Sequence, residues 1–244
     1  MNGRLVRRSD LVPREEEAMF ALLAGQFDRV SRERFRRDLD AKGWAILLHD
    51  RDGALRGFST LDCYESRFRD EPVTVVCSGD TVVDEDAAGG FALSKTWIGA
   101  VQLLRRLHPR GPLYWLLIVS GYRTYRFLPV YWKRFHPRHD AHPSSETRDL
   151  VDTLATERFG PLYDREGGIV RFPEPQVLRT RFRGVPKAKR ADAHVAFFAD
   201  RNDGHERGDE LVCLTELSRD NLTPAGHRMW AAGHRLFAET EVRT

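Results

Sequence analysis

Three histidines recur at every third position in one short segment, and imidazole rings with such a spacing can bind a divalent metal. His136, His139 and His142 are accompanied by Asp140, which adds a carboxylate. However, a proline follows the first of these histidines and another follows the last. Prolines interrupt the helix that would align the rings on one face. The pattern therefore favours a polar loop over a metal site.

Cysteine is the second residue type that could do chemistry. Cys63 and Cys77 could accept an acyl group only if a base or a helix N-terminus lowered the pKa of the thiol, and the sequence identifies neither. With Cys213 they make three cysteines and no CxxC pair, which excludes a full disulfide framework. No GxSxG elbow, Walker loop or GxGxxG fingerprint is present, which argues against common hydrolases, nucleoside triphosphatases and dinucleotide-binding enzymes.

Composition narrows the class of protein further. The 244 residues include 39 Lys+Arg and 36 Asp+Glu, a net charge of +3, and 41% hydrophobic residues. This balance predicts a globular chain, and the interspersed acids argue against a nucleic-acid surface. The longest apolar run, Leu113 to Val119, is far shorter than the roughly 18 residues that cross a bilayer. The first residues contain no apolar signal segment, so we expect a cytoplasmic protein.

Hydrophobic spacing predicts the elements that would position these side chains in the first half of the chain. An Asp-Gly pair ending at Gly53 predicts a hairpin. Gly79 predicts a bulge or break within the strand over 72–83. Residues 113–119 are apolar at every position, which suits a strand buried on both faces. The predicted strands are 4–8, 44–49, 54–61, 72–83 and 113–119, and the predicted helices are 15–27, 31–43, 90–108 and 122–135.

The second half is less regular. The spacing predicts a helix over 146–158, little periodicity over 161–190, and a C-terminal helix that begins at Thr223 and Pro224. Residues 194–199 and 210–217 flank an Asn-Asp-Gly turn, which predicts a second hairpin.

This order of elements resembles the acyltransferase fold of the GNAT superfamily over residues 4 to about 135, and the second hairpin would supply the last two strands. The resemblance implies an α/β fold of the α+β type, with a central mixed, mostly antiparallel sheet flanked by helices and an enlarged C-terminal half. We expect one domain over 1–244: a core over 1–135, a helical and loop insertion over 136–192, and a closing hairpin with a C-terminal helix over 193–244.

The resemblance also implies a turn that binds the diphosphate of acyl-coenzyme A. Amides at a helix N-terminus carry partial positive charge, and small residues let an anion approach the backbone. The sequence departs from the family pattern, because Ala87 stands where Arg or Gln is expected and acids occupy 84–86. The residues implied to bind the cofactor are Val82, Val83, Ala88, Gly89, Gly90, Phe91 and Ala92.

In that family the strand after the cofactor helix parts from its neighbour to admit the acyl chain. A tyrosine four residues ahead of a phenylalanine then protonates the departing thiolate. Tyr131 with Phe135 fits that spacing, with Tyr122 and Tyr125 as competitors. A phenol suits this step because its pKa of about 10 is close to that of a thiol leaving group.

The same reaction needs a polarised carbonyl and a base. A backbone amide near Gly79 would polarise the thioester carbonyl. Asp80, Ser78 and Glu65 are candidates for the group that takes the proton of the amine, and the sequence does not choose among them.

The sequence therefore predicts an N-acyltransferase that moves an acyl group from acetyl-CoA or a longer acyl-CoA to an unidentified small-molecule amine, with no metal. Two alternatives stay open. Ala87 and the acidic turn favour a non-catalytic binding or regulatory module. The basic segment Arg171 to Arg190 could instead meet an acyl carrier protein or an aminoacyl-tRNA as donor.

Overall fold

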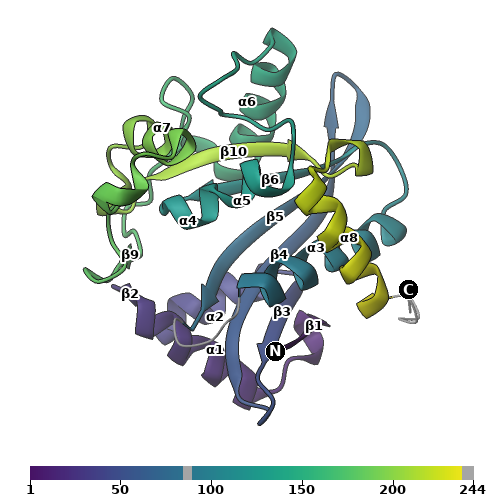
Figure 1. The fold of residues 1–244 in the computed structure, drawn as a ribbon, viewed down its shortest axis with the longest axis vertical. Coiled ribbons are helices and arrows are strands. Elements are labelled where there is room, and N and C mark those ends of the chain that lie inside the picture. Colours follow the sequence, from purple (N-terminus) through teal and green to yellow (C-terminus); the bar gives the residue numbers. More distant parts are fainter. Residues whose placement is uncertain (85–89, 238–244) are drawn as a thin grey trace.

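A central sheet of eight strands organises the chain in the computed structural model, which describes residues 1–84 and 90–237 (Figure 1). The order across the sheet is β1-β3-β4-β5-β6-β10-β8-β7, and β2 pairs with β9 in a separate small sheet. The strands are β1 Asn2–Arg7, β2 Phe27–Asp28, β3 Trp44–His49, β4 Leu55–Phe68, β5 Glu71–Val83, β6 Leu113–Val119, β7 Tyr163–Asp164, β8 Ile169–Val170, β9 Val177–Leu178 and β10 Glu210–Glu216.

Among the described strands, β5 and β6 run parallel and the other recorded pairs are antiparallel. The mixed, mostly antiparallel sheet that the sequence predicted is confirmed. The longer helices are α1 Pro13–Gln26, α2 Arg32–Asp40, α3 Gly90–Leu107, α6 Ser145–Phe159, α7 Ala193–Arg201 and α8 Pro224–Phe237, and the short ones are α4 Tyr122–Tyr125 and α5 Phe127–Tyr131.

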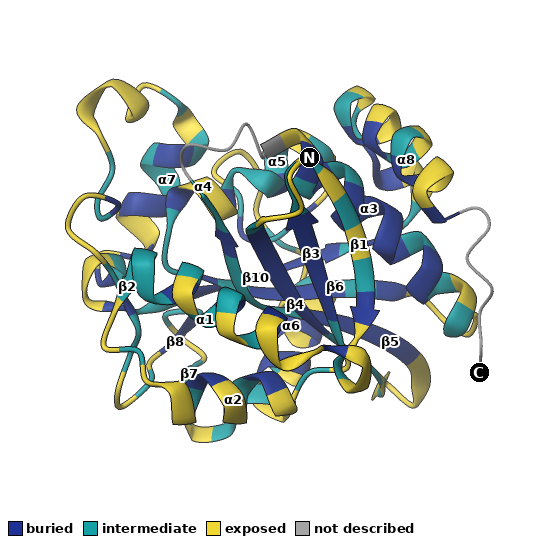
Figure 2. Ribbon diagram, turned by 90° about the horizontal axis from the view of Figure 1, so that it is seen from below, coloured by how far each residue is buried: buried dark blue, intermediate teal, exposed yellow. Residues whose placement is uncertain are grey.

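Side-chain alternation along the strands gives the sheet two buried faces (Figure 2). Ile46 of β3 packs with residues of α3 and α8, whereas its neighbour Leu47 packs with α1 and α2. Leu116 of β6 packs with α6 on the side opposite to α3. We call the two sides the α3 face and the α2 face. Each helix buries one apolar stripe, so the sheet is covered on both sides.

The helices α3 and α8 cross closely, which fixes the position of α3 on its face. A Cβ added at Gly233 of α8 would lie 2.7 Å from the Cα of Gly99 in α3. Small residues at a crossing let two helix backbones approach, and a larger side chain at either position would push them apart. The N-terminal half of α3, which carries the predicted donor turn, is thereby held against the sheet.

Most elements of the first half agree with their predicted positions. The Asp-Gly hairpin joins β3 to β4, Ser31 caps α2 by accepting a hydrogen bond from the amide of Arg34, and β6 covers the predicted 113–119. The hydroxyl of Thr223 accepts from the amide of Gly226 at the start of α8. Capping side chains and turn residues act locally, which is why they can be read from sequence.

The predicted second hairpin is wrong. Residues 194–199 lie in α7, where the Asp192 side chain accepts hydrogen bonds from two amides of the first turn. Val195, Phe198 and Ala199 are buried with helical spacing. The outer partner of β10 is β8 instead, with Leu211 opposite Ile169. The run of five apolar residues over 195–199 fits either structure, and the cap with the neighbouring core decides for a helix.

None of the helices in the described part of the chain is long and apolar enough to span a membrane.

Candidate functional site

The neighbouring strands β5 and β6 part halfway along their length. They pair from Thr74 opposite Leu113 to Cys77 opposite Leu116. Beyond this point β5 continues to Val83 and β6 to Val119, and no pairing between them is recorded among the described residues. Figure 1 shows the two strands diverging. The structure therefore has the parted strands that the resemblance implied, and we call the space between them the wedge.

A bulge in β5 stands at the start of the wedge, where the sequence predicted a break. Ser59 pairs with Thr81 and Leu61 with Ser78, so Gly79 and Asp80 together face the single residue Thr60. Bulges re-aim the side chains that follow them. A Cβ at Gly79 would lie 2.5 Å from the Thr60 hydroxyl oxygen and 2.6 Å from Cε of Lys42. Only glycine fits there, and Asp80 is turned toward α2.

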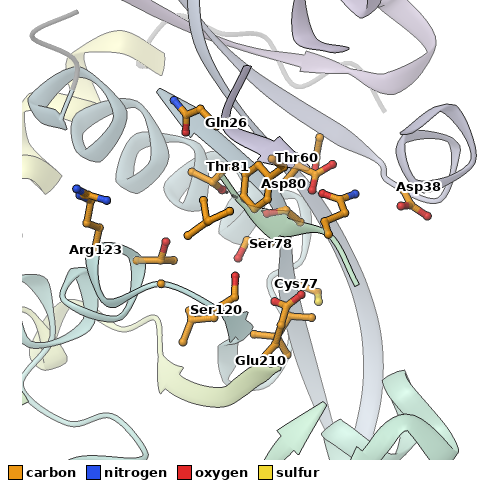
Figure 3. A pocket seen from close by; sticks show the side chains of 18 of the residues that line it. Gln26, Asp38, Thr60, Cys77, Ser78, Asp80, Thr81, Ser120, Arg123 and Glu210 are labelled. Atoms are coloured by element: carbon orange, nitrogen blue, oxygen red, sulfur yellow. Dashed lines mark hydrogen bonds between the residues drawn. The ribbon is translucent and has the colours of Figure 1, made fainter. Parts of the chain in front are cut away.

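A cavity of about 1240 Å³ occupies the wedge and reaches both faces of the sheet. This exceeds the roughly 300–1000 Å³ of ordinary ligand pockets. Figure 3 shows Ser78 and Ser120 facing each other from the two sides of the wedge. The cavity is thus large enough to receive two substrates from opposite faces of the sheet.

On the α3 face the cavity has an aromatic wall. The hydroxyl of Tyr131 in α5 donates to the hydroxyl of Ser94 in α3, at 2.8 Å. The Trp97 and Trp115 rings lie 4.1 Å apart between centroids, and the Trp115 indole N–H donates to the Ser78 hydroxyl at 3.0 Å. Tyr131 therefore presents a phenol at the cavity, and a fixed indole holds Ser78 at the point where the strands part.

The two competing tyrosines occupy different positions. Tyr125 is fully buried, donates to the carbonyl of Pro137 at 2.8 Å and does not line the cavity. Burial raises the pKa of its hydroxyl. Tyr122 is buried and lines the cavity. Of the three, Tyr131 combines access to the cavity with a hydrogen bond to a residue of α3.

On the α2 face the wall is charged. Burial, reinforced by the charge of Asp38, raises the pKa of the Asp80 carboxyl to about 6, while Lys42 and Arg34 act against this rise. Burial, reinforced by the charge of Asp80, raises the pKa of Glu210 to about 8. Both carboxyls line the cavity. At neutral pH the pKa values leave Asp80 mostly ionised and Glu210 mostly protonated.

Sequence reasoning found Asp80 but missed the group around it. Arg34, Asp38 and Lys42 come from α2 and the turn after it, and Glu210 comes from the start of β10. These four charged residues belong to no recognisable sequence motif, so the sequence around each of them does not indicate that it lines a cavity. Only the tertiary structure brings α2 and β10 to one cavity.

The other predicted base, Glu65, lies elsewhere. It is an exposed residue of β4, opposite Thr74, at the end of the hairpin away from the wedge, and it does not line the cavity. A side chain there cannot reach a substrate between the parted strands. Ser78 does line the cavity, beside the Trp115 indole.

The predicted donor turn is only partly described. Ala87, Ala88 and Gly89 lie outside the described residues. Val82 is buried in the cluster under α1, and the Val83 carbonyl accepts a hydrogen bond from the Gln26 amide group at 2.6 Å. Val83 also lines the cavity, whereas Val82 does not.

The described first turn of α3 contains Gly90, Phe91 and Ala92, with Phe91 exposed and Ala92 buried. The carboxylate of Asp84, one of the acids expected to repel a phosphate, pairs with Arg56 at 3.2 Å. That ion pair lowers the negative charge presented next to the helix.

The basic segment forms a strap over the cavity, which we define as residues 172–184. Its strand β9 pairs with β2, and seven of its residues line the cavity. Arg179 and Arg183 reach Asp28 at 3.6 and 3.8 Å, and Arg181 donates to the carbonyl of Gly25 at 3.2 Å. Three of the predicted partner-binding cations therefore hold the strap to the N-terminal half.

The thiols and the histidines of the opening motifs take structural positions. Burial raises the pKa of the buried Cys77 thiol, and it raises that of Cys63 to about 12. Burial lowers the pKa of His136 to about 4, and the His139 ring packs on His194 at 4.4 Å. Among the described residues no group of three His, Cys, Asp or Glu is arranged to hold a metal ion.

Comparisons with known proteins give matches to solved structures alone. No family model and no curated protein match the sequence. A probable N-acyltransferase from Enterococcus faecalis has a TM-score of 0.40 and 17% identity, over 55% of this chain and 33% of that one. A GNAT family N-acetyltransferase from Escherichia coli in complex with CoA has a TM-score of 0.38 and 15% identity, over 52% and 68%. An acyl-CoA N-acyltransferase from Pseudomonas aeruginosa has a TM-score of 0.36 and 16% identity, over 60% and 93%.

The chain spans about a third of the Enterococcus protein's length. The fold itself rests on the observed topology: a strand, two helices, three antiparallel strands, a helix, and a strand that is parallel to its neighbour and parts from it. By these features the chain has a GNAT-like fold.

Proposed function

We propose that the protein is an N-acyltransferase that moves an acyl group from an acyl-CoA thioester to an amine. The observation that carries this proposal is a single cavity between two parted strands, with Tyr131 on one face of the sheet and Asp80 on the other. A thioester and an amine entering from opposite faces would meet inside the wedge. Such positioning converts a bimolecular reaction into one between held neighbours.

The thioester would lie against β5 beyond Cys77. Past that residue the described part of the chain shows no strand pairing on the edge of β5 that faces β6, so the backbone amides there are available to a carbonyl oxygen. An amide there stabilises the negative charge that develops on this oxygen as the amine attacks. The bulge at Gly79 favours this role because it changes the direction of the backbone at the same point.

The reaction needs two proton transfers. The amine nitrogen attacks the carbonyl carbon, forming a C–N bond, and the C–S bond breaks. Asp80, whose raised pKa of about 6 leaves it ionised and basic at neutral pH, takes a proton from the attacking nitrogen. Tyr131 gives its hydroxyl proton to the leaving sulfur, directly or through Ser94, to which it is hydrogen-bonded.

The coenzyme would extend from the wedge along α3. Leu93 and Ser94 of that helix line the cavity, and Gly90 to Ala92 form the helix turn before them. The amides of this turn carry partial positive charge, which favours a phosphate at that end.

Release of free thiol tests the proposal. The protein is incubated with acetyl-, medium-chain and long-chain acyl-CoA and a panel of amines, and the free CoA thiol is measured with matched reactions that lack the amine or the protein. We expect amine-dependent thiol release with at least one donor, and a higher melting temperature in the presence of that donor alone.

A melting temperature unchanged by every acyl-CoA, together with no thiol release, would reject acyl-CoA as donor. Donor-induced stabilisation without release of the CoA thiol in the presence of any amine would instead support the non-catalytic module.

A further inference from the structure

The strand β10, which pairs with β6 at one side of the wedge, carries a carboxyl of its own. Leu211 of β10 pairs with Val119 at the end of β6, so Glu210 lies beside the open end of the wedge. Glu210 shares its face of the sheet with Val212, which packs in the cluster with α6. That is the α2 face, toward which the bulge turns Asp80. One carboxyl thus stands on each side of the wedge, and both line one cavity (Figure 3).

The Glu210 carboxyl has no recorded hydrogen bond or ion pair in the described part of the chain, and Glu210 is a partly buried residue that lines the cavity. Enclosed carboxyls in proteins are normally paired, because loss of hydration is costly without a compensating partner. A partly buried carboxyl that faces a cavity and lacks a protein partner suits a cationic partner supplied by a ligand. The positive charge of that ligand favours the ionised form of Glu210, which burial and Asp80 disfavour in the free protein.

The nearby cations are engaged elsewhere. Arg34, a cation that acts on the Glu210 carboxyl, pairs with Asp38 at 3.6 Å and donates to the carbonyl of Glu174. Arg158 pairs with Asp62 at 3.0 Å. Lys42 lies over Gly79 and acts on Asp80. Asp80 therefore has a cation beside it, whereas Glu210 faces Asp80 and a guanidinium that is already occupied.

Aromatic rings complete this side of the cavity. Phe159 at the end of α6 and Phe172 at the start of the strap both line it. Rings of this kind accept an alkyl chain or the face of a cation. The α2 face of the cavity thus offers two carboxyls separated by the wedge, with apolar surface beside them.

We propose that Glu210 determines acceptor specificity by binding a second cationic group of the acceptor. The preferred acceptor is then a diamine, or an amine with a distal ammonium or guanidinium, whose reacting nitrogen lies at Asp80. This inference rests on the proposed N-acyltransferase function, and Glu210 positions the substrate without touching the reacting atoms.

The test compares straight-chain monoamines with α,ω-diamines of matched length, on the wild-type protein, on Glu210→Gln and on the control Glu216→Gln. Glu216 lies at the other end of β10 and does not line the cavity. Two readouts are taken: kcat and KM for acyl transfer, and calorimetric binding of each amine to the protein without donor.

We expect the wild-type protein to have a kcat/KM for a diamine roughly 10- to 100-fold higher than for the matched monoamine. Most of this difference should lie in KM, because one charge-assisted contact strengthens binding by about that factor. Glu210→Gln should reduce that ratio to about one, and Glu216→Gln should keep it. A wild-type ratio near one, or a ratio that survives Glu210→Gln in a folded variant, would overturn the inference while leaving acyl transfer intact.

The binding readout separates the two proposals. Diamine binding that depends on Glu210, without acyl transfer to any amine, would support this acceptor site and reject the proposed reaction. Equal binding of monoamines and diamines, or no binding of either, would overturn the inference whatever the activity.

Discussion

The two walls of the cavity differ in chemistry and in origin. The α3-face wall is mainly aromatic and comes from α3, β6 and α5, which follow one another between Gly90 and Tyr131. The α2-face wall is charged and draws on α2, the bulge of β5, the strap and the start of β10, which span residues 32 to 210. The first wall therefore belongs to one stretch of chain, and the second exists only after distant segments meet.

This difference indicates a division of labour under the proposed function. Closely packed rings such as Trp97 and Trp115 give a rigid wall with few polar groups, which suits a thioester arm. Asp80 and Glu210 lie in a partly dehydrated setting where a single added charge changes their protonation. We expect the α3-face wall to govern the leaving group and the α2-face wall to govern the acceptor.

The largest effect should come from the α3-face wall. Tyr131→Phe removes the hydroxyl that donates to Ser94 and should lower kcat by roughly 10²-fold or more, because the thiolate then leaves without its proton. Steady-state kinetics with the best donor and amine measure this. Tyr114→Phe, on β6 but outside the cavity lining, is the matched control. Equal turnover in the two variants would exclude Tyr131 as the acid.

A smaller effect with a distinct signature is expected on the α2 face. The raised pKa of Asp80, about 6, predicts that kcat/KM falls as pH drops below about 6, because a base works only when it is deprotonated. Asp80→Asn should lower kcat/KM by about 10- to 100-fold and remove that acidic limb.

Asp70→Asn is the control for Asp80→Asn, since Asp70 sits in a turn with positive φ that asparagine tolerates. If kcat/KM of Asp80→Asn still falls at acidic pH, the titrating group is the amine substrate or another residue, and not Asp80.

The free energy of unfolding, measured without substrate, should depend on pH because of Glu210. The folded-state pKa of Glu210, about 8, lies above the unfolded value of about 4.3, so the folded state holds its proton more tightly. Stability from this group is complete below about pH 4.3 and is lost as pH rises through 8.

Glu210→Gln should therefore melt several degrees higher than the wild type at pH 8.5 and at the same temperature near pH 4. Thermal melts across this range measure the difference. A gain of equal size at both pH values would mean that the substitution acts through packing and not through charge.

The smallest effect is expected at the strap. Asp28 pairs with Arg179 and Arg183 at 3.6 and 3.8 Å and is half exposed, so Asp28→Asn should cost less than about 1 kcal/mol of unfolding free energy. Chemical denaturation measures this. A larger loss would show that the pairs, and not the β2–β9 backbone contact, hold the strap over the α2-face wall.

The α3-face wall was also the part that sequence could predict. Trp115 lies in an apolar run that is buried on both faces, and Tyr131 has a family spacing to Phe135. The first signal comes from periodicity within one element, and the second from the resemblance to a known family. The prediction of a break at Gly79 succeeded for the same reason, because a glycine that interrupts strand alternation is a local mark.

The sequence predictions that differ from the structure depended on contacts between segments that are distant in the chain. Residues 194–199 looked like a strand because the five apolar residues over 195–199 fit both periods, and the cap at Asp192 was needed to decide. Glu65 looked like a base because sequence cannot tell which end of a hairpin reaches the wedge. The arginines of 171–190 looked like a docking surface, although their partners on α1 and β2 lie some 150 residues away in sequence.

By itself, then, the sequence predicted the first strands of the central sheet and the helix that follows its third long strand, since these follow from hydrophobic period, turns and caps. The candidate phenol came from the resemblance to a known family. The tertiary structure alone decided where the strands part, that Asp80 turns toward α2, and that Glu210 shares its cavity. The reason is that burial and charge coupling depend on which distant segments surround a carboxyl, and a pKa moves only once that surrounding protein is assembled.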